Sequence, residues 1–278
     1  MNLGLDAPGA IERLAETMRV IAIAEERMAR LPEDPALLGE PGTELHRWVH
    51  EELPDPTVDP RLTTLSALDS SVQCLTQIRR FVLDPRPTTT PMVLAALMRG
   101  SLLAGARPIF MFGPLEPEKR KTNILRVMRQ ETDSLFQCYD RNASYVDFAG
   151  LVPPPEVLSA QRVRRTRIHE LTERLGEATM LREAAEILAD RIAAHPGKDN
   201  DLPVDDPQRL LVEHLLWIFN AYSGKAHGYG WPRLVAHPGD LPGDFVSDIT
   251  LLATLTHTAV HVTEEAHLGR SIDQTRMR

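Results

Sequence analysis

The segment FNAYSGKAHGYGW (219–231) ends an apolar stretch with small and polar residues that suit acid–base or anion-binding chemistry. Residues at helical spacing share one face of a helix. A buried polar side chain without a partner costs roughly 1–3 kcal/mol, so buried polar groups on that face need partners such as Arg99 or Arg107. We therefore expect a buried polar seam that includes Arg99. The face at helical spacing holds Glu213, Trp217, Asn220, Gly224 and His227.

Two interpretations of this seam stay open. In the first, a polar network fixes the register of the helices, and His227 closes a helix C-terminus. In the second, the seam lines a functional cleft whose candidate catalytic residues are His227, Asn220, Glu213 and Arg99. No phosphate-binding loop, dinucleotide fingerprint or G-x-S-x-G motif occurs, which argues against a typical nucleotidase, dehydrogenase or hydrolase. The sequence leaves open whether the protein is an enzyme.

The segment HTAVHVTEEAH (257–267) holds a second group of chemically capable side chains. On a helix, His257, His261 and Glu264 share one face, and their spacing suits a Zn or Fe site. Glu264 and His267 form a Glu-x-x-His pair of the kind used in di-iron bundles, although a second such pair is missing. The alternative is a solvated His-rich helix face with no cofactor.

Two basic clusters could contact an acidic partner. Ion pairs within each helix are the simplest interpretation. RNA, an acidic protein or the chain's own N-terminal segment are the alternatives, because residues 1–60 hold 5 basic and 13 acidic residues in a chain of net charge −8. This balance argues against a general nucleic-acid coat but allows a local anion site. The clusters are Lys119, Arg120, Lys121, Arg126 and Arg129, and Arg162, Arg164, Arg165 and Arg167.

Helical periodicity dominates the chain, and no stretch has convincing strand character. Prolines break the helical pattern throughout residues 32–60. Thr90-Pro91 and Asp206-Pro207 are typical of an N-cap followed by the first helical residue. The apolar stretch from Pro91 contains Arg99, which indicates a buried helix rather than a membrane span. The expected helices cover residues 9–31, 61–83, 91–112, 117–139, 155–176, 179–194, 207–226 and 245–268, with a short one inside the Pro-rich run.

These elements predict an all-α fold, a multi-helix bundle of about eight helices with the 91–139 and 207–226 helices at its core. We expect two parts. Residues 1–60 form an acidic N-terminal helix and a Pro-rich strap, and residues 61–278 form the bundle domain. No secretory signal is evident, so we expect a cytoplasmic protein that does not contact a membrane.

Two segments resemble a set of poorly characterised all-α actinobacterial proteins. One is an Arg-containing apolar helix followed by a Pro-broken turn and a basic helix, here residues 92–129. The other is a Ser-Gly-x-Ala-His-Gly turn, here residues 223–228. Those proteins resemble HEPN-like bundles, in which an Arg and a His near a helix end form a metal-independent ribonuclease site. The resemblance implies a HEPN-like core and RNA cleavage at His227. It departs in two respects. Tyr222 stands about where that motif has its Arg, and the acidic residue expected after the early Arg is missing, because Leu103 follows Arg99 by four residues.

We therefore expect a soluble helical-bundle protein that has an interaction or structural role and forms a homodimer. We expect it to bind no cofactor. A HEPN-like protein that cleaves RNA or binds a nucleotide is one alternative. A helical protein that binds Zn or Fe is the other.

Overall fold

The computed structural model describes residues 8–55, 57–84, 89–147, 149–194, 206–236 and 240–269. Within these ranges the chain is helical and has no strand, which confirms the all-α prediction. The long helices are α1 (Ala10–Met28), α3 (Pro60–Leu83), α4 (Pro91–Phe112), α5 (Pro117–Ala143), α6 (Pro155–Leu171), α7 (Glu177–Ala194), α8 (Pro207–Ala226) and α9 (Phe245–Leu268). The short elements are η1 (Pro35–Leu37), α2 (Glu44–Arg47), η2 (Trp48–Glu52), η3 (Ala149–Leu151) and η4 (Trp231–Leu234).

The helix starts follow the capping chemistry expected from the sequence. The Thr90 side chain accepts from the Val93 amide at 3.3 Å. The Asp206 side chain accepts from the Arg209 amide at 2.8 Å. In both helices a proline follows the cap, where its missing N–H leaves no hydrogen bond unmade. These two predicted boundaries are confirmed to the residue.

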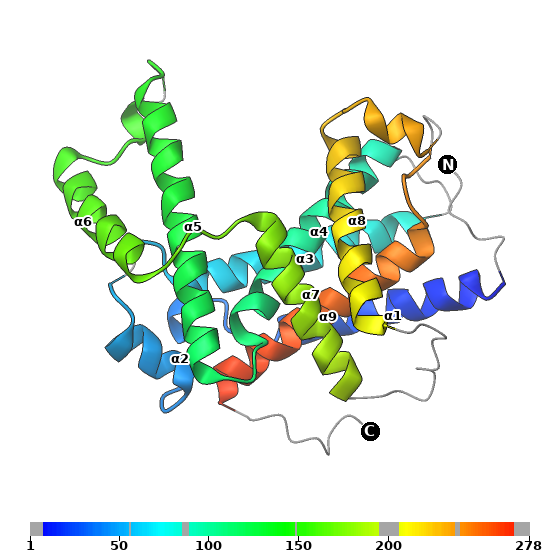
Figure 1. The fold of residues 1–278 in the computed structure, drawn as a ribbon, viewed down its shortest axis with the longest axis horizontal. Coiled ribbons are helices and arrows are strands. Elements are labelled where there is room, and N and C mark those ends of the chain that lie inside the picture. The colour runs from blue at the N-terminus through cyan, green and yellow to red at the C-terminus, as the bar shows by residue number, and fades with distance from the viewer. Residues whose placement is uncertain are drawn as a thin grey trace.

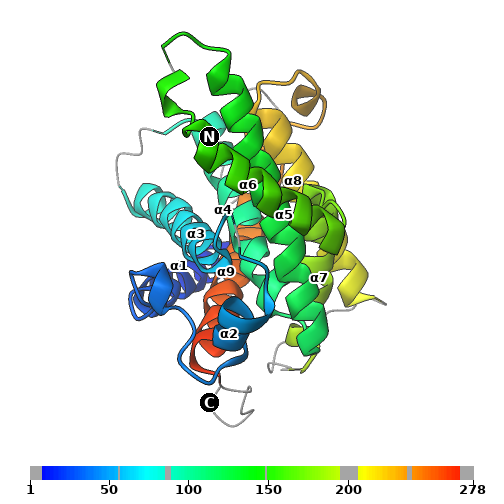
Figure 2. The same cartoon turned by 90° about the vertical axis from the view of Figure 1, so that its left-hand side faces the viewer.

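Helix α4 is the centre of the bundle (Figures 1 and 2). It packs most extensively against α3 and α9, then against α8 and α7, and much less against α5. The expectation that the 91–139 and 207–226 helices form the core is therefore correct for α4 and α8 but wrong for most of α5. The reason is composition: α5 has one apolar stripe among many charges, whereas α4 is apolar nearly all round.

Small residues and hydroxyls let α3, α4 and α9 approach closely. Ser71 of α3 donates to, or accepts from, Thr256 of α9 at 2.7 Å, and it lies 3.0 Å from the Ser101 carbonyl of α4. The side chains of Ser71, Ser101 and Thr256 are buried, and their hydroxyls are hydrogen-bond partners of one another inside the core. The hydroxyl cluster thus fixes where the three helices cross.

Two projections rise from the bundle on opposite sides (Figure 1). The outer part of α5 and the whole of α6 form one of them, which we call the α5–α6 arm. Asp133 of α5 joins the two helices by accepting from Arg165 Nε at 2.9 Å and by contacting His169 Nε2 at 2.8 Å. The other projection is the α8–η4 lobe, residues 217–235, formed by the C-terminal half of α8 and by η4.

The N-terminal region wraps the bundle. Helix α1 packs against α9 and α3, and the segment from η1 to η2 runs on toward α5. Its acidic side chains contact the two basic clusters. Three ion pairs of 2.5 Å join Glu44 to Arg120, Glu52 to Lys121 and Asp55 to Arg164. The basic clusters therefore have an acidic partner within the chain. A division into domains at residue 60 stays a prediction.

By length and composition alone, α4 could cross a membrane. However, 61% of its most apolar window is buried inside the bundle. That burial fits the central helix of a soluble protein.

Candidate functional site

Arg99 joins α4 to the Ser-Gly-x-Ala-His-Gly turn, but it contacts Ser223 and not the predicted partners Glu213, Asn220 and His227. Its Nε donates to Ser223 Oγ at 2.7 Å, and its guanidinium lies 5.7 Å from the centre of the Phe219 ring. One guanidinium nitrogen is 3.7 Å from a carboxylate oxygen of Glu177 on α7. Arg99 therefore links three helices at the base of the lobe.

The rest of the predicted seam is not buried. Glu213, Asn220 and His227 are all exposed, so the prediction of a buried seam is wrong for these three residues. Glu213 instead lies 3.7 Å from Arg209, one turn earlier on the same helix. The physical reason is that α8 turns the neighbouring face, which holds Leu215 and Ile218, toward α4 and α7. Ala221 and Tyr222 also lie on that inward face.

The turn after α8 is built as a closed helix end. The backbone N–H of His227 donates to the Ser223 carbonyl at 2.9 Å, so His227 caps the helix through its backbone while its ring stays exposed. Gly224 is tightly covered, because a Cβ atom there would lie 2.5 Å from the Trp231 ring. Gly224 therefore allows another group to approach closely, as expected. That group is the indole of Trp231 in η4 and not another backbone segment.

Arg107, the other predicted partner of the seam, lies away from α8. Its guanidinium is 3.2 Å from a carboxylate oxygen of Glu131 on α5. Only Arg99 of the two core arginines therefore reaches the turn.

A different polar cluster is buried between α8 and α9. Asp248 is 1% exposed. Its Oδ1 lies 2.7 Å from His214 Nε2, and its Oδ2 accepts from the Tyr222 hydroxyl at 2.6 Å. Burial beside this carboxylate raises the pKa of Tyr222, so the phenol stays a hydrogen-bond donor. Gly243 leaves the necessary space, since a Cβ there would lie 2.3 Å from Asp248 Oδ2.

Sequence analysis missed this cluster, although one signal was present. His214 and Tyr222 are eight residues apart and share a helix face. Their partner, Asp248, lies in the first turn of another helix, and no spacing rule connects helices separated by a loop. The cluster connects α8 to α9 through two hydrogen bonds to Asp248.

The three predicted metal ligands converge, but on an arginine. Arg27 of α1 donates through Nε to Glu264 Oε2 at 3.0 Å. Its two terminal nitrogens lie 3.2 Å from His257 Nε2 and 2.8 Å from His261 Nδ1. A second contact joins Arg27 to Glu264 at even shorter range. The prediction that these side chains share a face is therefore confirmed, and the guanidinium takes the place expected for a metal cation.

The contacts to Arg27 define the ring protons of both histidines. An arginine only donates, so His257 Nε2 and His261 Nδ1 must accept. The remaining proton of His261 is then on Nε2, which lies 3.1 Å from Glu265 Oε1, although the two atoms are poorly aligned for a hydrogen bond. Burial, reinforced by the Arg27 charge, lowers the pKa of His257 to about 4.

The described part of the chain contains no group of three or more His, Cys, Asp or Glu side chains placed to hold a metal ion. His267, which the sequence placed near this group, instead accepts from the Gly39 amide through Nδ1 at 3.1 Å. Zn or Fe binding by His257, His261 and Glu264 stays a hypothesis, and in this arrangement it requires Arg27 to move away.

Comparison of the chain with protein-family models, with curated proteins and with solved structures gave no match. The case for function therefore rests on the geometry of the molecule.

The low pKa of His257 predicts a pH-dependent stability. An unfolded histidine titrates near 6.5, so between pH 6.5 and 4 the unfolded chain binds a proton that the folded protein excludes. This contribution is fully present above pH 6.5 and is lost as the pH falls toward 4. Relative to His257→Gln, the wild type should lose roughly 3 kcal/mol of unfolding free energy across that window. Urea titrations of both proteins at several pH values measure it, and parallel profiles would contradict it.

The position of the Arg27 guanidinium predicts that removing this side chain creates a metal site. In Arg27→Ala the two histidines and Glu264 lose their cation, and we expect Zn²⁺ to raise the melting temperature by several degrees. Wild-type protein, with the guanidinium in place, should not respond. Arg27→Ala/His261→Ala is the control and should not respond either. A Zn²⁺-dependent shift of the same size in wild type and Arg27→Ala would show that the guanidinium does not occupy the cation position.

Proposed function

We propose that this protein is a soluble, non-catalytic binding protein that works as a homodimer, and that the α8–η4 lobe is its dimer surface. The supporting observation is that this lobe exposes five large apolar or aromatic side chains. Leu234 is 87% exposed and Tyr229 is 60% exposed. Soluble monomers rarely leave large apolar patches in water. The exposed apolar residues of the lobe are Trp217, Tyr229, Trp231, Leu234 and Val235.

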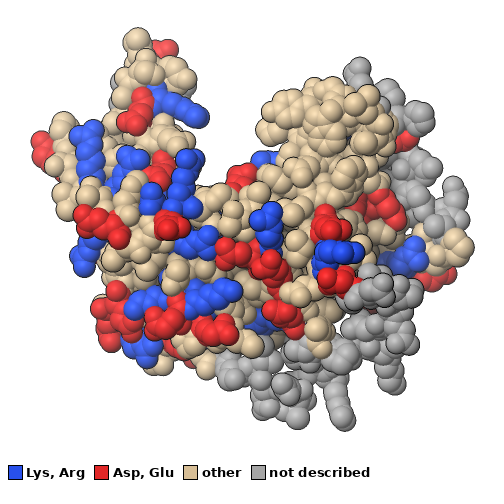
Figure 3. Space-filling model, in the orientation of Figure 1, with Lys and Arg blue, Asp and Glu red and all other residues tan. Residues whose placement is uncertain are grey.

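The charge pattern favours a second copy as the occupant. On the face in Figure 3, the upper end of the lobe carries no charged side chain, whereas the α5–α6 arm opposite is covered with both signs. A two-fold contact places the same patch on both sides of an interface. The exposed Trp, Tyr, Leu and Val side chains of the lobe suit this symmetry, because none of them carries a charge that would meet its own copy. Exposed tryptophan and tyrosine are also the side chains that interfaces favour.

The direct test changes one exposed leucine. Leu234→Asp places a charge in the centre of the patch, and we expect a dimer to become a monomer by sedimentation velocity at micromolar concentration. Val146→Asp is the matched control, since Val146 is 95% exposed and lies at the tip of the arm. It should leave the dimer intact. A monomeric wild type, or a dimer that survives Leu234→Asp, would contradict the proposal.

A second candidate function is RNA cleavage or nucleotide binding at the base of the lobe, and one observation favours it. Arg99 reaches the turn that carries His227, whose ring is exposed and lies 5.8 Å from the Tyr229 ring. Exposed aromatic rings together with basic side chains are typical of surfaces that hold single-stranded nucleic acid. In this proposal the protein is a HEPN-like relative of the actinobacterial set, and the cytoplasm is its place of action.

Cleavage of total RNA in EDTA tests this second function. If His227 acts as the general acid or base, His227→Ala should lower the rate by about 100-fold or more. His46→Ala, which removes a histidine from the strap, should cleave like the wild type. Equal cleavage by wild type and His227→Ala would reject the site, and absence of cleavage by the wild type would reject the activity.

A further inference from the structure

The Pro-rich strap carries two histidines whose rings lie against each other. His46 belongs to α2, and His50 follows four residues later in η2, so both rings project from one side of this short helical segment. The ring centres are 4.4 Å apart, and the ring planes are tilted by 48°. The pair is separate from the α8–η4 lobe, and the inference below does not depend on dimer formation.

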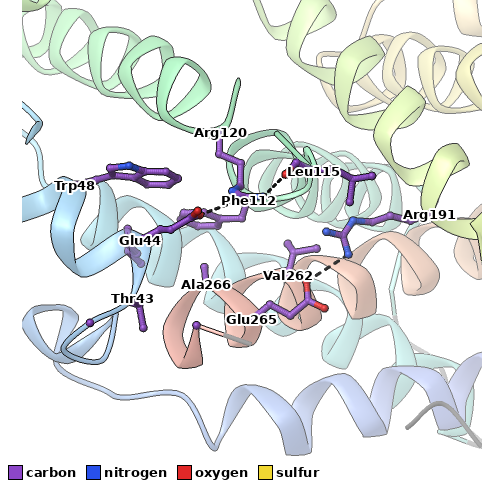
Figure 4. Close-up of a pocket in the computed structure, with 13 residues that line it drawn as sticks. Thr43, Glu44, Trp48, Phe112, Leu115, Arg120, Arg191, Val262, Glu265 and Ala266 are labelled. Carbon is purple, nitrogen blue, oxygen red and sulfur yellow. Dashed lines mark hydrogen bonds and ion pairs between the residues drawn. The ribbon is translucent and has the colours of Figure 1, made fainter. Parts of the chain in front are cut away.

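The other side of the segment fixes it to the bundle. Leu45 is 1% exposed and Trp48 is 2% exposed. Figure 4 shows Trp48 beside Arg120 of α5, whose guanidinium lies 5.9 Å from the centre of the indole ring. The Thr43 side chain caps the start of the segment by accepting from the His46 amide at 3.2 Å. The two histidines therefore stand on a segment that packing and capping hold in place.

The ring nitrogens of both histidines are available to a ligand. Neither ring makes a hydrogen bond or an ion pair within the part of the chain that the structure describes, and His50 is exposed. By contrast, His257 and His261 have the same spacing but use their rings on Arg27. A neutral imidazole has one nitrogen with a lone pair, so the strap offers two nitrogens for a metal ion.

The separation of the rings indicates the geometry around a shared ion. A metal–imidazole bond is about 2.0 Å, and the nitrogen lies about 1.1 Å from the ring centre, so that centre lies about 3.1 Å from the ion. Two rings at about 90° then have centres about 4.4 Å apart, whereas the tetrahedral angle gives about 5.1 Å. The observed 4.4 Å matches the right-angled arrangement. Rotation of a ring about its Cβ–Cγ bond leaves its centre nearly in place, so the match holds for either nitrogen.

The charges around the pair cancel, so the imidazoles decide which ion binds. Three carboxylates and three cations belong to this segment and to its ion pairs with α5. Ca²⁺ and Mg²⁺ need carboxylate oxygens, whereas neutral imidazole suits Cu²⁺, Ni²⁺ and Zn²⁺. Of these three, Cu²⁺ binds nitrogen most tightly, and right angles between ligands are typical of Cu²⁺ and Ni²⁺. The six charged residues are Glu44, Glu51, Glu52, Arg47, Arg120 and Lys121.

We propose that His46 and His50 bind one Cu²⁺ ion through one nitrogen of each ring, with water in the remaining positions. His50 lines a cavity of about 900 Å³, which leaves room for those waters. Because both nitrogens come from one anchored segment, the second binds intramolecularly once the first has bound. Zn²⁺ prefers the tetrahedral angle and fits this pair less well, so the Zn²⁺ response expected of Arg27→Ala belongs to the group on α9.

Titration of the full chain with Ni²⁺ measures the affinity. Ni²⁺ shares the right-angled geometry and, unlike Cu²⁺, does not oxidise the exposed thiol of Cys138, which lines the same cavity. At slightly alkaline pH, where free histidines are neutral, isothermal titration should give one site with a micromolar dissociation constant. His46→Gln and His50→Gln should each weaken binding about ten-fold or more, because a single imidazole lacks the intramolecular second step. Urea unfolding of both variants checks that they fold like the wild type.

A variant with two histidines at the wrong spacing is the matched control. His50→Gln/Glu51→His moves the second ring by about 100° around the helix, so it should bind Ni²⁺ as weakly as His50→Gln alone. Cu²⁺ supplies the second readout. In Cys138→Ser protein with one equivalent of Cu²⁺, the electron paramagnetic resonance spectrum should show coupling to two imidazole nitrogens, and to one when His46→Gln is added.

Three results would overturn the proposal. The first is no binding of Ni²⁺ or Cu²⁺ up to millimolar concentration. The second is equal affinity in the wild type and in both single-histidine variants, which would place the ion elsewhere. The third is wild-type affinity in the variant with the wrong spacing, which would show only adventitious binding by exposed histidines.

Discussion

The bundle depends on the close approach of α3, α4 and α9 around Gly105. A Cβ atom at this glycine would lie 2.6 Å from Leu255 Cδ2 and 3.0 Å from Ser71 Oγ, so a larger residue would displace these buried side chains. The hydroxyls of Ser71 and Thr256 meet beside it. Because α4 is contacted on nearly every side, its position sets that of α7 and α8 as well.

Both ends of α4 make polar contacts with other elements. Near its N-terminal half, Arg99 contacts Ser223 and so anchors the base of the α8–η4 lobe. At its C-terminal end, the carbonyls of Gly113, Pro114 and Leu115 accept hydrogen bonds from Arg120 and Arg191. Between these ends most α4 side chains are buried, and the partly exposed Arg107 pairs with Glu131 of α5.

Sequence reasoning succeeded where the determining forces are local. Helix starts at Thr90 and Asp206 follow from capping, and the shared face of His257 and His261 follows from helical period. It failed for the inward face of α8, because that helix is apolar over several faces and periodicity does not state which one meets α4. It also failed to place Arg27 among the histidines, since the contact joins α1 to α9 across more than 200 residues.

The sequence shows where the charged residues lie along the chain, but not which of them form ion pairs. The acidic excess of residues 1–60 is visible in the sequence, and its pairing with the basic clusters was one of several alternatives. Only the fold shows that Glu44, Glu52 and Asp55 lie against Arg120, Lys121 and Arg164. With these cations paired within the chain, the exposed apolar side chains of the α8–η4 lobe become the stronger candidate for contact with a partner.

Hydrogen–deuterium exchange across a dilution series tests the central claim, that a rigid α4-centred core presents the α8–η4 lobe to a second copy. On dilution, backbone amides of η4 and of the end of α8 should exchange faster, because dissociation uncovers them. Amides of α3, α4 and α9 should exchange slowly at every concentration. Exchange in the lobe that does not depend on concentration, or a dependence located in the α5–α6 arm instead, would contradict the account.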